Sequence, residues 1–324
     1  MFKIQHSAKP ALTTLRAAGP TANFPRGLPL RFPHSIAGCI VLLAAIMADP
    51  SGGLATLVYA ADSPGTAAAT AELATIELAA AAQGVERIVA HRGAMLERPE
   101  NTIAAIERAI EAGATAVEID IRTSRDGRLV LMHDAKVDRT TDGTGRVSDL
   151  SWAELMALDA GSSFDPKYAA ERVPSLEQTL KACRGRIDVQ LDLKEDGAAY
   201  ADRIAACVKA HGEPSRIMVA VQSVKQAHQI KERLPQVSTL IFLRKKKNLD
   251  AFLAAKVDFL RPQIAWLEDD PNLLAKIREG GAKIHFDVTT GTTEKVLPLL
   301  KYQPESLLSD DPAQLVKTLT QLQK

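Results

Sequence analysis

The chain has 324 residues, 46% of them apolar, and a formal net charge of +1 from 40 basic and 39 acidic side chains. These values are those of an ordinary globular protein with one large domain or two small ones. They argue against a nucleic-acid partner, because the one dense basic run, 244–247, is short and lacks interleaved aromatic residues. We interpret that run as a solvated loop.

The first 60 residues predict a signal peptide and export region. Scattered lysines and arginines precede the uncharged apolar run 36–47, and the first acidic residue is Asp49. This apolar run is too short to span a bilayer, which takes about 20 residues, and small residues around Ala60 offer a cleavage point. We therefore expect an exported protein, periplasmic or secreted, without a stable membrane anchor.

Two cysteines remain in the exported part, because Cys39 leaves with the signal. An oxidising compartment permits a disulfide between Cys183 and Cys207. Two separately buried thiols are the alternative, and the sequence leaves both possibilities open.

A regular alternation of short apolar runs and amphipathic stretches begins at residue 85, after the alanine-rich segment 61–84, which we interpret as a helix or linker. The strand candidates are 87–91, 116–121, 187–193, 217–221, 239–243, 257–260, 283–288 and 306–309. Eight strand-helix units over about 240 residues are typical of one architecture. The segment 85–324 is therefore predicted to be an α/β domain, a (β/α)8 TIM barrel.

One further apolar run, 129–133, does not fit this alternation. It follows the second strand too closely for a parallel crossover, which needs a dozen or more residues. The sequence 124–127 is typical of a turn, so we predict an antiparallel hairpin that places His133 roughly opposite Glu118. The polar excursion at about 134–174, with one short helix, is then a small insertion after the second-strand hairpin, beside the site.

Polar residues gather where three of the predicted strands end. His91 ends the first strand, Glu118 and Asp120 the second, and Asp192 and Lys194 the third. Catalytic groups of a TIM barrel lie at these carboxyl ends. The other histidines, at 211, 228 and 285, are interpreted as surface or core residues.

The carboxylates indicate a cation site. Glu118 and Asp120 project from the same strand face, and together they repel each other unless a cation lies between them. Asp192 adds a third oxygen ligand, and such a set suits one divalent cation, Mg²⁺ or Ca²⁺, rather than zinc. The alternative is a buried ion pair with Arg92 or Lys194.

Several short motifs lie along the predicted barrel. They are His91-Arg92-Gly93, Pro99-Glu100-Asn101-Thr102, Glu118-Ile119-Asp120, His133-Asp134, the run 138–145, Val173-Pro174-Ser175-Leu176-Glu177 and Ser309-Asp310-Asp311-Pro312. As a set, from residue 88 to 312, they closely resemble the glycerophosphodiester phosphodiesterase family. That family's fold is a TIM barrel with a small insertion after the histidine-aspartate motif.

The resemblance implies metal-dependent hydrolysis of glycerophosphodiesters, a small-molecule substrate, to glycerol 3-phosphate and an alcohol. It implies that His91 and His133 are the acid and the base, and that Glu118 and Asp120 bind the metal. Asp192 stands where the family most often has glutamate, one methylene longer, so we expect ligation with an altered distance or a bridging water.

The resemblance further implies that Arg92, Lys194 and Glu100 contact the substrate. A second departure lies at 286–289, where many members have a tryptophan-threonine pair and this chain has Phe-Asp-Val-Thr. This departure affects the pocket wall and leaves the preferred head group open.

Other points stay open at this stage. The attacking group is either the glycerol 2-hydroxyl, which forms a cyclic phosphate first, or water. A lysophospholipase D or sphingomyelinase D-like activity is an alternative, although the late loops offer only Trp266 and a few leucines for an acyl chain. An alternative of another class is a non-catalytic barrel that binds phosphate esters, and the sequence does not indicate an oligomeric state.

Overall fold

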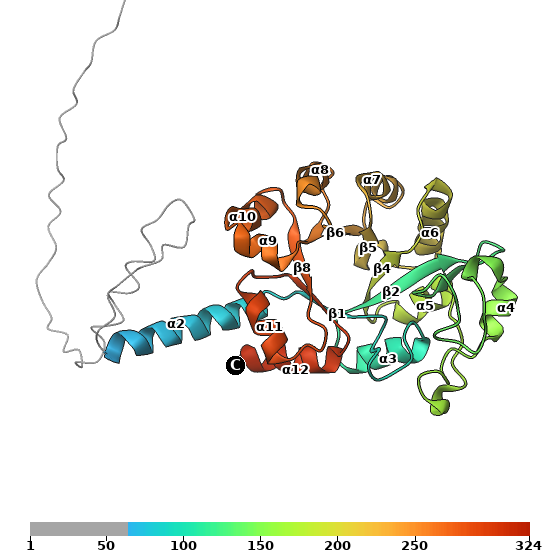
Figure 1. The fold of residues 1–324 in the computed structure, drawn as a ribbon, viewed down its shortest axis with the longest axis horizontal. Coiled ribbons are helices and arrows are strands. Elements are labelled where there is room, and N and C mark those ends of the chain that lie inside the picture. Colours follow the sequence, from blue (N-terminus) through green and yellow to red (C-terminus); the bar gives the residue numbers. More distant parts are fainter. Residues whose placement is uncertain (1–63) are drawn as a thin grey trace, which may run out of the picture. The chain divides into compact units, whose positions relative to one another are not determined.

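Eight parallel strands close into a barrel ringed by helices in the computed structural model, which describes residues 64–324 (Figure 1). The strands are β1 (Arg87–Ala90), β2 (Ala116–Thr123), β4 (Asp188–Leu193), β5 (Ile217–Val221), β6 (Ser238–Phe242), β7 (Phe259–Arg261), β8 (Lys283–Asp287) and β9 (Ser306–Ser309). Pairing of β1 with both β2 and β9 closes the ring. The predicted TIM barrel is confirmed, while the predicted signal peptide and export region lies outside the described residues.

Helices follow the strands and cover the outside of the barrel. They are α3 (Ile103–Glu111), α5 (Leu176–Cys183), α6 (Ala198–His211), α7 (Val224–Arg233), α8 (Leu249–Ala254), α9 (Ile264–Asp269), α10 (Asn272–Glu279), α11 (Thr293–Leu300) and α12 (Pro312–Leu322). Their starts are encoded locally: Thr102 Oγ1 accepts a hydrogen bond from Ala105 N, and Ser175 forms a capping box with Gln178. These caps fix where α3 and α5 begin after their strands.

Alternation along the strands decides which side chains reach the site. Ile119 and Ile121 of β2, with Leu191 of β4, are fully buried in the main core between strands and helices. The intervening residues, Glu118 and Asp120, must therefore face the barrel interior.

The antiparallel strand β3 (Leu129–Leu131) pairs with the end of β2, as predicted for the hairpin. Ile121 pairs with Leu131, and Met132 N donates to Asp120 O at 3.0 Å. Continued by two residues, this register places His133 level with Ile119, the neighbour of Glu118, in agreement with the approximate position predicted.

The insertion has a small core of its own, separate from the main one. Its only α-helix is α4 (Trp152–Ala157), and two short 3₁₀ helices, Val147–Asp149 and Pro166–Tyr168, flank it. The buried members of this core are Val130, Met132, Val137, Val147, Leu155, Ala160 and Val173. The insertion is thus packed against the hairpin that carries His133.

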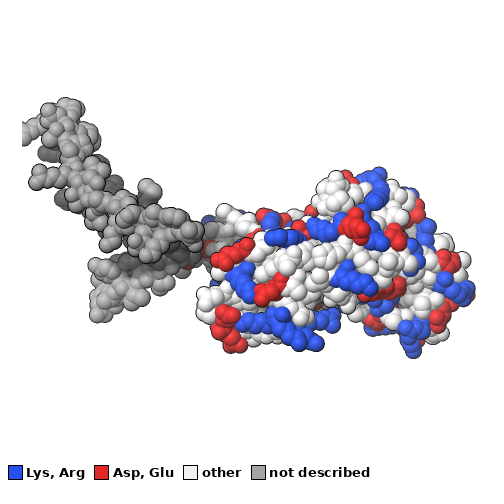
Figure 2. All heavy atoms as spheres, turned by 90° about the horizontal axis from the view of Figure 1, so that it is seen from above, with Lys and Arg blue, Asp and Glu red and all other residues white. Residues whose placement is uncertain are grey.

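The alanine-rich segment forms α2 (Pro64–Gln83), whose end contacts α12 through a hydrogen bond from Gln323 Nε2 to Ala82 O at 3.1 Å. None of the described helices is both long and apolar enough to cross a membrane. Figure 2 shows acidic and basic side chains interspersed over the face in view.

The two cysteines predicted as a disulfide or as separate thiols are both free. Burial raises the pKa of Cys183 to about 12 and that of Cys207 to about 11. At neutral pH both are protonated, unreactive thiols.

Candidate active site

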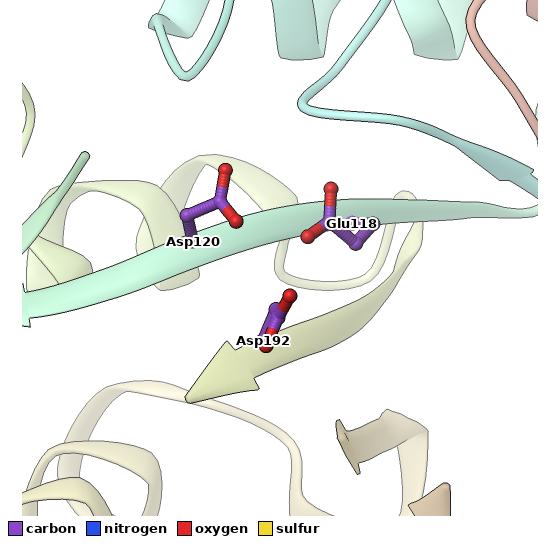
Figure 3. A group of neighbouring side chains, drawn as sticks. All are labelled: Glu118, Asp120 and Asp192. Carbon is purple, nitrogen blue, oxygen red and sulfur yellow. The ribbon is translucent and has the colours of Figure 1, made fainter. Parts of the chain in front are cut away.

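Three carboxylates meet at the carboxyl-terminal end of the barrel. Glu118 and Asp120 extend from β2 and Asp192 from β4, and Figure 3 shows the three side chains gathered around a common space. One oxygen atom of each lies within 4.8 Å of the others. Oxygen atoms at this spacing can hold a divalent cation, since Mg²⁺ and Ca²⁺ prefer carboxylate ligands.

Two basic side chains accompany these carboxylates but do not balance them. Lys194 Nζ lies 2.8 Å from Asp120 Oδ1 and 2.7 Å from Asp192 Oδ2, and Arg92 Nε lies 3.5 Å from Asp120 Oδ2. Within the described part of the chain, Glu118 receives one hydrogen bond, from the Arg92 backbone N–H at 2.9 Å. Burial, and then the charges of Asp120 and Asp192, raises the pKa of Glu118 well above its ordinary value. Ion pairs with Arg92 and Lys194, the alternative to a cation site, therefore account for Asp120 and Asp192 but not for Glu118.

The loop after β1 holds two residues in the left-handed backbone region, Arg92 at φ 53° and Asn101 at φ 56°. Such a conformation costs a non-glycine residue about 1–3 kcal/mol. Asn101 is fixed by two bonds to Asp120, donating from Nδ2 to Oδ2 at 2.7 Å and accepting from the backbone N–H at 3.1 Å. Gly93 between them has no substitute, because a Cβ there would lie 2.6 Å from the Ala105 Cβ of α3.

His91 is paired with an acidic residue from the far end of the chain. Its Nδ1 lies 2.6 Å from Asp310 Oδ1, and both side chains are about one quarter exposed, at 27% and 28%. An ionised carboxylate only accepts hydrogen bonds, so Nδ1 carries the proton. The other ring nitrogen, Nε2, is left to exchange a proton with a ligand.

His133 has the same arrangement with its neighbour. Its Nδ1 lies 2.7 Å from Asp134 Oδ1, and Arg139 Nε donates to Asp134 Oδ2 at 2.7 Å. Arg139 holds the pKa of Asp134 well below its usual range, against the opposing effect of burial. Burial raises the pKa of Asp120, but Lys194, a bond from Asn101 and the charge of His133 outweigh burial and lower it. The charge of His133 therefore acts on the carboxylate of Asp120.

Glu100 joins the two histidine loops. Its oxygens accept from Arg92 Nη1 at 3.0 Å and from Arg139 Nη1 and Nη2, both at 2.8 Å. Burial acts to raise the pKa of Glu100, but the two arginines lower it overall. The carboxylate therefore stays ionised and holds both guanidinium groups.

Beneath the carboxylates, the barrel interior contains buried polar groups. His285 is 0% exposed, and its Nδ1 lies 2.8 Å from Ser306 Oγ. Burial first, then Arg261 and Arg87, lowers the pKa of His285 to about 3. His285 is therefore a neutral core histidine, one of the two interpretations made from the sequence.

A cavity of about 500 Å³ opens beside the carboxylates. One side is formed by His91, Glu118, Asp192 and Lys194. Strands β6 to β8 and the loop after β6 form the other side, with Phe242, Arg244, Lys245, Arg261 and Asp287. This volume is in the range of sites for small molecules.

Of the residues predicted for the site, His91, Glu118, Asp192 and Lys194 line the cavity. Asp120 and Arg92 contact this group. His133 is not part of the cavity lining and is connected to the site through Asp134, Arg139 and Glu100. Asp310 and Asn101 were missed, although both lie in motifs that the sequence displays. Arg261 lies in none of these motifs, whereas Asp287 falls within 286–289, the segment expected to affect the pocket wall.

A comparison with known proteins identifies the family. Residues 91–314 match the model of the Glycerophosphoryl diester phosphodiesterase family. The chain belongs to this family.

Relatives and solved structures agree with this assignment. A glycerophosphodiester phosphodiesterase of Caldanaerobacter subterraneus is 28% identical over 233 residues, covering 71% of this chain and 96% of the relative. The enzyme of that name from Bacillus subtilis is 32% identical over 184 residues, covering 51% of this chain and 63% of the relative. The crystal structure of the glycerophosphodiester phosphodiesterase from Agrobacterium tumefaciens, 28% identical, has a TM-score of 0.63 and covers 71% of this chain and 98% of that one.

Proposed function

We propose that this protein hydrolyses glycerophosphodiesters to glycerol 3-phosphate and an alcohol. The observation that carries the proposal is the presence of two histidine-aspartate pairs and three clustered carboxylates at the mouth of one barrel in a chain of this family. Hydrolysis of a phosphodiester needs one proton removed from the attacking oxygen and one delivered to the leaving oxygen. Two oriented imidazoles can supply both transfers.

His91 and His133 are the proton-transferring residues in this proposal. Asp310 and Asp134 hold Nδ1 of each ring in its protonated form, so each Nε2 is free for the reaction. One histidine takes the proton of the attacking hydroxyl, and the other gives a proton to the oxygen of the departing alcohol. The same two transfers serve direct attack by water and attack by the glycerol 2-hydroxyl followed by hydrolysis of the cyclic phosphate.

The carboxylate cluster fits one divalent cation, Mg²⁺ or Ca²⁺. The fit rests on Glu118, which is buried beside two further carboxylates and receives one backbone hydrogen bond. When bound by Glu118, Asp120 and Asp192, the cation would neutralise negative charge that develops on the phosphoryl oxygens.

Arg92 and Lys194 are the side chains that would contact the phosphoryl group. Both carry positive charge beside the carboxylates, and both are mostly shielded from solvent, with side-chain exposures of 14% and 15%. Glu100 stands behind Arg92, accepting a bond from Nη1 at 3.0 Å. We therefore assign Glu100 a role in positioning Arg92 for the substrate.

Neither alternative has comparable support. The cavity wall opposite the carboxylates carries arginine, lysine and aspartate beside Ile241, Phe242 and Phe252, and Trp266 is not part of it. These charged groups make the wall a poor surface for the acyl chain of a lysophospholipid. A non-catalytic binding barrel has no need for two imidazoles with paired carboxylates. We further propose that the enzyme acts outside the cytoplasm, because residues 1–60 are predicted from the sequence to be a signal peptide and export region.

The decisive assay incubates the purified protein with a panel of glycerophosphodiesters in the presence of Mg²⁺ or Ca²⁺ and measures glycerol 3-phosphate. Turnover that is abolished by a chelator and restored by the cation supports the proposal. A lysophospholipid in the same panel separates the lysophospholipase D alternative. Absence of turnover with every diester and both cations would overturn the proposed function.

A further inference from the structure

The basic run that follows β6 lies at the catalytic end of the barrel. Arg244 and Lys245 line the cavity, whereas Lys246 extends to Asp270, with Nζ 2.8 Å from Oδ2. Both cavity-lining residues are exposed, as predicted for a solvated loop. Neither forms an ion pair with an acidic residue of the described chain, so their charges are available to a ligand.

A third cation continues this surface from the neighbouring strand. Arg261, at the end of β7, forms an ion pair with Asp287 at the end of β8. Arg244 and Arg261 line the same cavity. Burial and then the charge of Arg244 lower the pKa of Arg261, whereas the charge of Asp192 acts to raise it. On this side of the cavity, which we name the basic wall, Arg244, Lys245 and Arg261 outnumber the one acidic lining residue, Asp287, so the basic wall carries excess positive charge.

Among the described residues that line the cavity, none offers a free aromatic face to an organic cation. The ring of Phe242 is covered by Arg261, whose guanidinium carbon lies 4.3 Å from the ring centroid. Phe252 is 6% exposed. Phe286 turns away from the cavity into the core, where its ring centroid lies 5.8 Å from that of Tyr302. A choline group, which proteins bind with aromatic faces, therefore has no receptor here.

The two sides of the cavity would contact different parts of the substrate. The carboxylates, His91 and Lys194 surround the place of the phosphoryl group, and the basic wall lies across the cavity, where the alcohol part of the diester would extend. Lys194 is paired with Asp120 and Asp192, and Arg261 with Asp287. Among the described residues that line the cavity, Arg244 and Lys245 therefore supply the unpaired positive charge.

We propose that the basic wall of Arg244, Lys245 and Arg261 makes this enzyme selective for glycerophosphodiesters whose alcohol bears an anionic group, a carboxylate or a phosphate, over those of choline or ethanolamine. This inference rests on the proposed function and names the substrate class of the same site. Complementary charge raises affinity and encounter rate for the anionic partner and disfavours the cationic one.

The test uses two substrates that differ by one carboxylate, glycerophosphoserine and glycerophosphoethanolamine, with kcat/KM measured for each. We expect the parent protein to prefer the serine compound about tenfold, the effect of a few partly exposed charge interactions. The double variant Arg244→Gln with Lys245→Gln brings the ratio close to 1, and the reversal Arg244→Glu with Lys245→Glu inverts it. Lys247→Gln is the matched control, because it removes a charge from the same run outside the cavity lining, and it keeps the parental ratio.

The preference should also decline as sodium chloride rises from about 0.05 M to 0.5 M, since salt screens charges on the scale of about 10 Å. Turnover of both compounds by the parent at a ratio of 1 or below would overturn the inference and leave the proposed function standing. A parental ratio in both double variants, at parental melting temperature, would also overturn it. Turnover of neither compound, while another glycerophosphodiester of the panel is hydrolysed, would overturn the inference alone. Absence of turnover with every diester and both cations would remove the proposed function, and this inference with it.

Discussion

Replacing Asp310 with asparagine tests whether the closure of the barrel orients the imidazole of His91, which we propose transfers a proton. Asp310 Oδ1 lies 2.6 Å from His91 Nδ1, so Asp310→Asn keeps the size of the side chain and removes the charge that fixes the proton on Nδ1. A hydrogen bond to a charged group contributes about 1.5–3 kcal/mol. Because about 1.36 kcal/mol corresponds to tenfold in rate, kcat should fall about 10- to 150-fold. KM should change little, since the bond acts on proton transfer in the transition state.

The assay is steady-state kinetics on one glycerophosphodiester across pH, with release of glycerol 3-phosphate as the readout. The limb of the pH profile that belongs to His91 should shift in the variant, which a merely structural role of Asp310 does not predict. Asp311→Asn is the control: Asp311 caps α12 by accepting from Gln314 N at 2.9 Å, and asparagine caps helices equally well. Parental kcat and an unchanged profile in Asp310→Asn would refute the orientation of His91 by this carboxylate.

Three further predictions concern the cation, the imidazoles and the barrel interior. Glu118→Gln should weaken the binding of Mg²⁺ or Ca²⁺ by about tenfold or more in calorimetric titration. The melting temperature without cation should be kept or raised, because the substitution deletes a buried charge and no core volume. Parental affinity for both cations would contradict the cation site. His91→Asn and His133→Asn should each lower kcat by about 10²- to 10⁴-fold with little change in KM. A p-nitrophenyl diester, whose leaving group needs no proton, should restore turnover only in the variant that lacks the acid. Near-parental turnover of both variants would make the histidines structural. Between pH 8 and pH 5 the native His285, with a pKa of about 3, stays neutral, while the imidazole in the unfolded chain, with a pKa near 6.5, takes up a proton. The free energy of unfolding should therefore fall by about 2 kcal/mol through this residue as the pH falls. Denaturant titrations of His285→Gln should lack this part of the pH dependence, and an equal pH dependence in both proteins would count against a neutral buried ring.

The amino-acid sequence by itself determined the elements and the faces of the site. Apolar residues at every second position of β2 dictate that Glu118 and Asp120 share the inner face, and the side chains of Thr102 and Ser175 mark helix starts. These features depend on near neighbours in the chain, with periods of 2 and 3.6 residues, and so they can be derived without a fold. The count of eight strands then implied the barrel and its carboxyl-terminal site.

Only the tertiary structure decided which distant residues meet. Closure of the barrel pairs Ala90 of β1 with Ser309 of β9, and this pairing brings Asp310 to His91 across 219 positions of sequence. The same closure places Arg244 on the cavity wall and not merely in a solvated loop. Such contacts depend on how strands tilt and how loops fold over the barrel mouth, and no local spacing in the chain encodes them. The position of the basic wall opposite the carboxylates therefore follows from the closed barrel and not from the sequence alone.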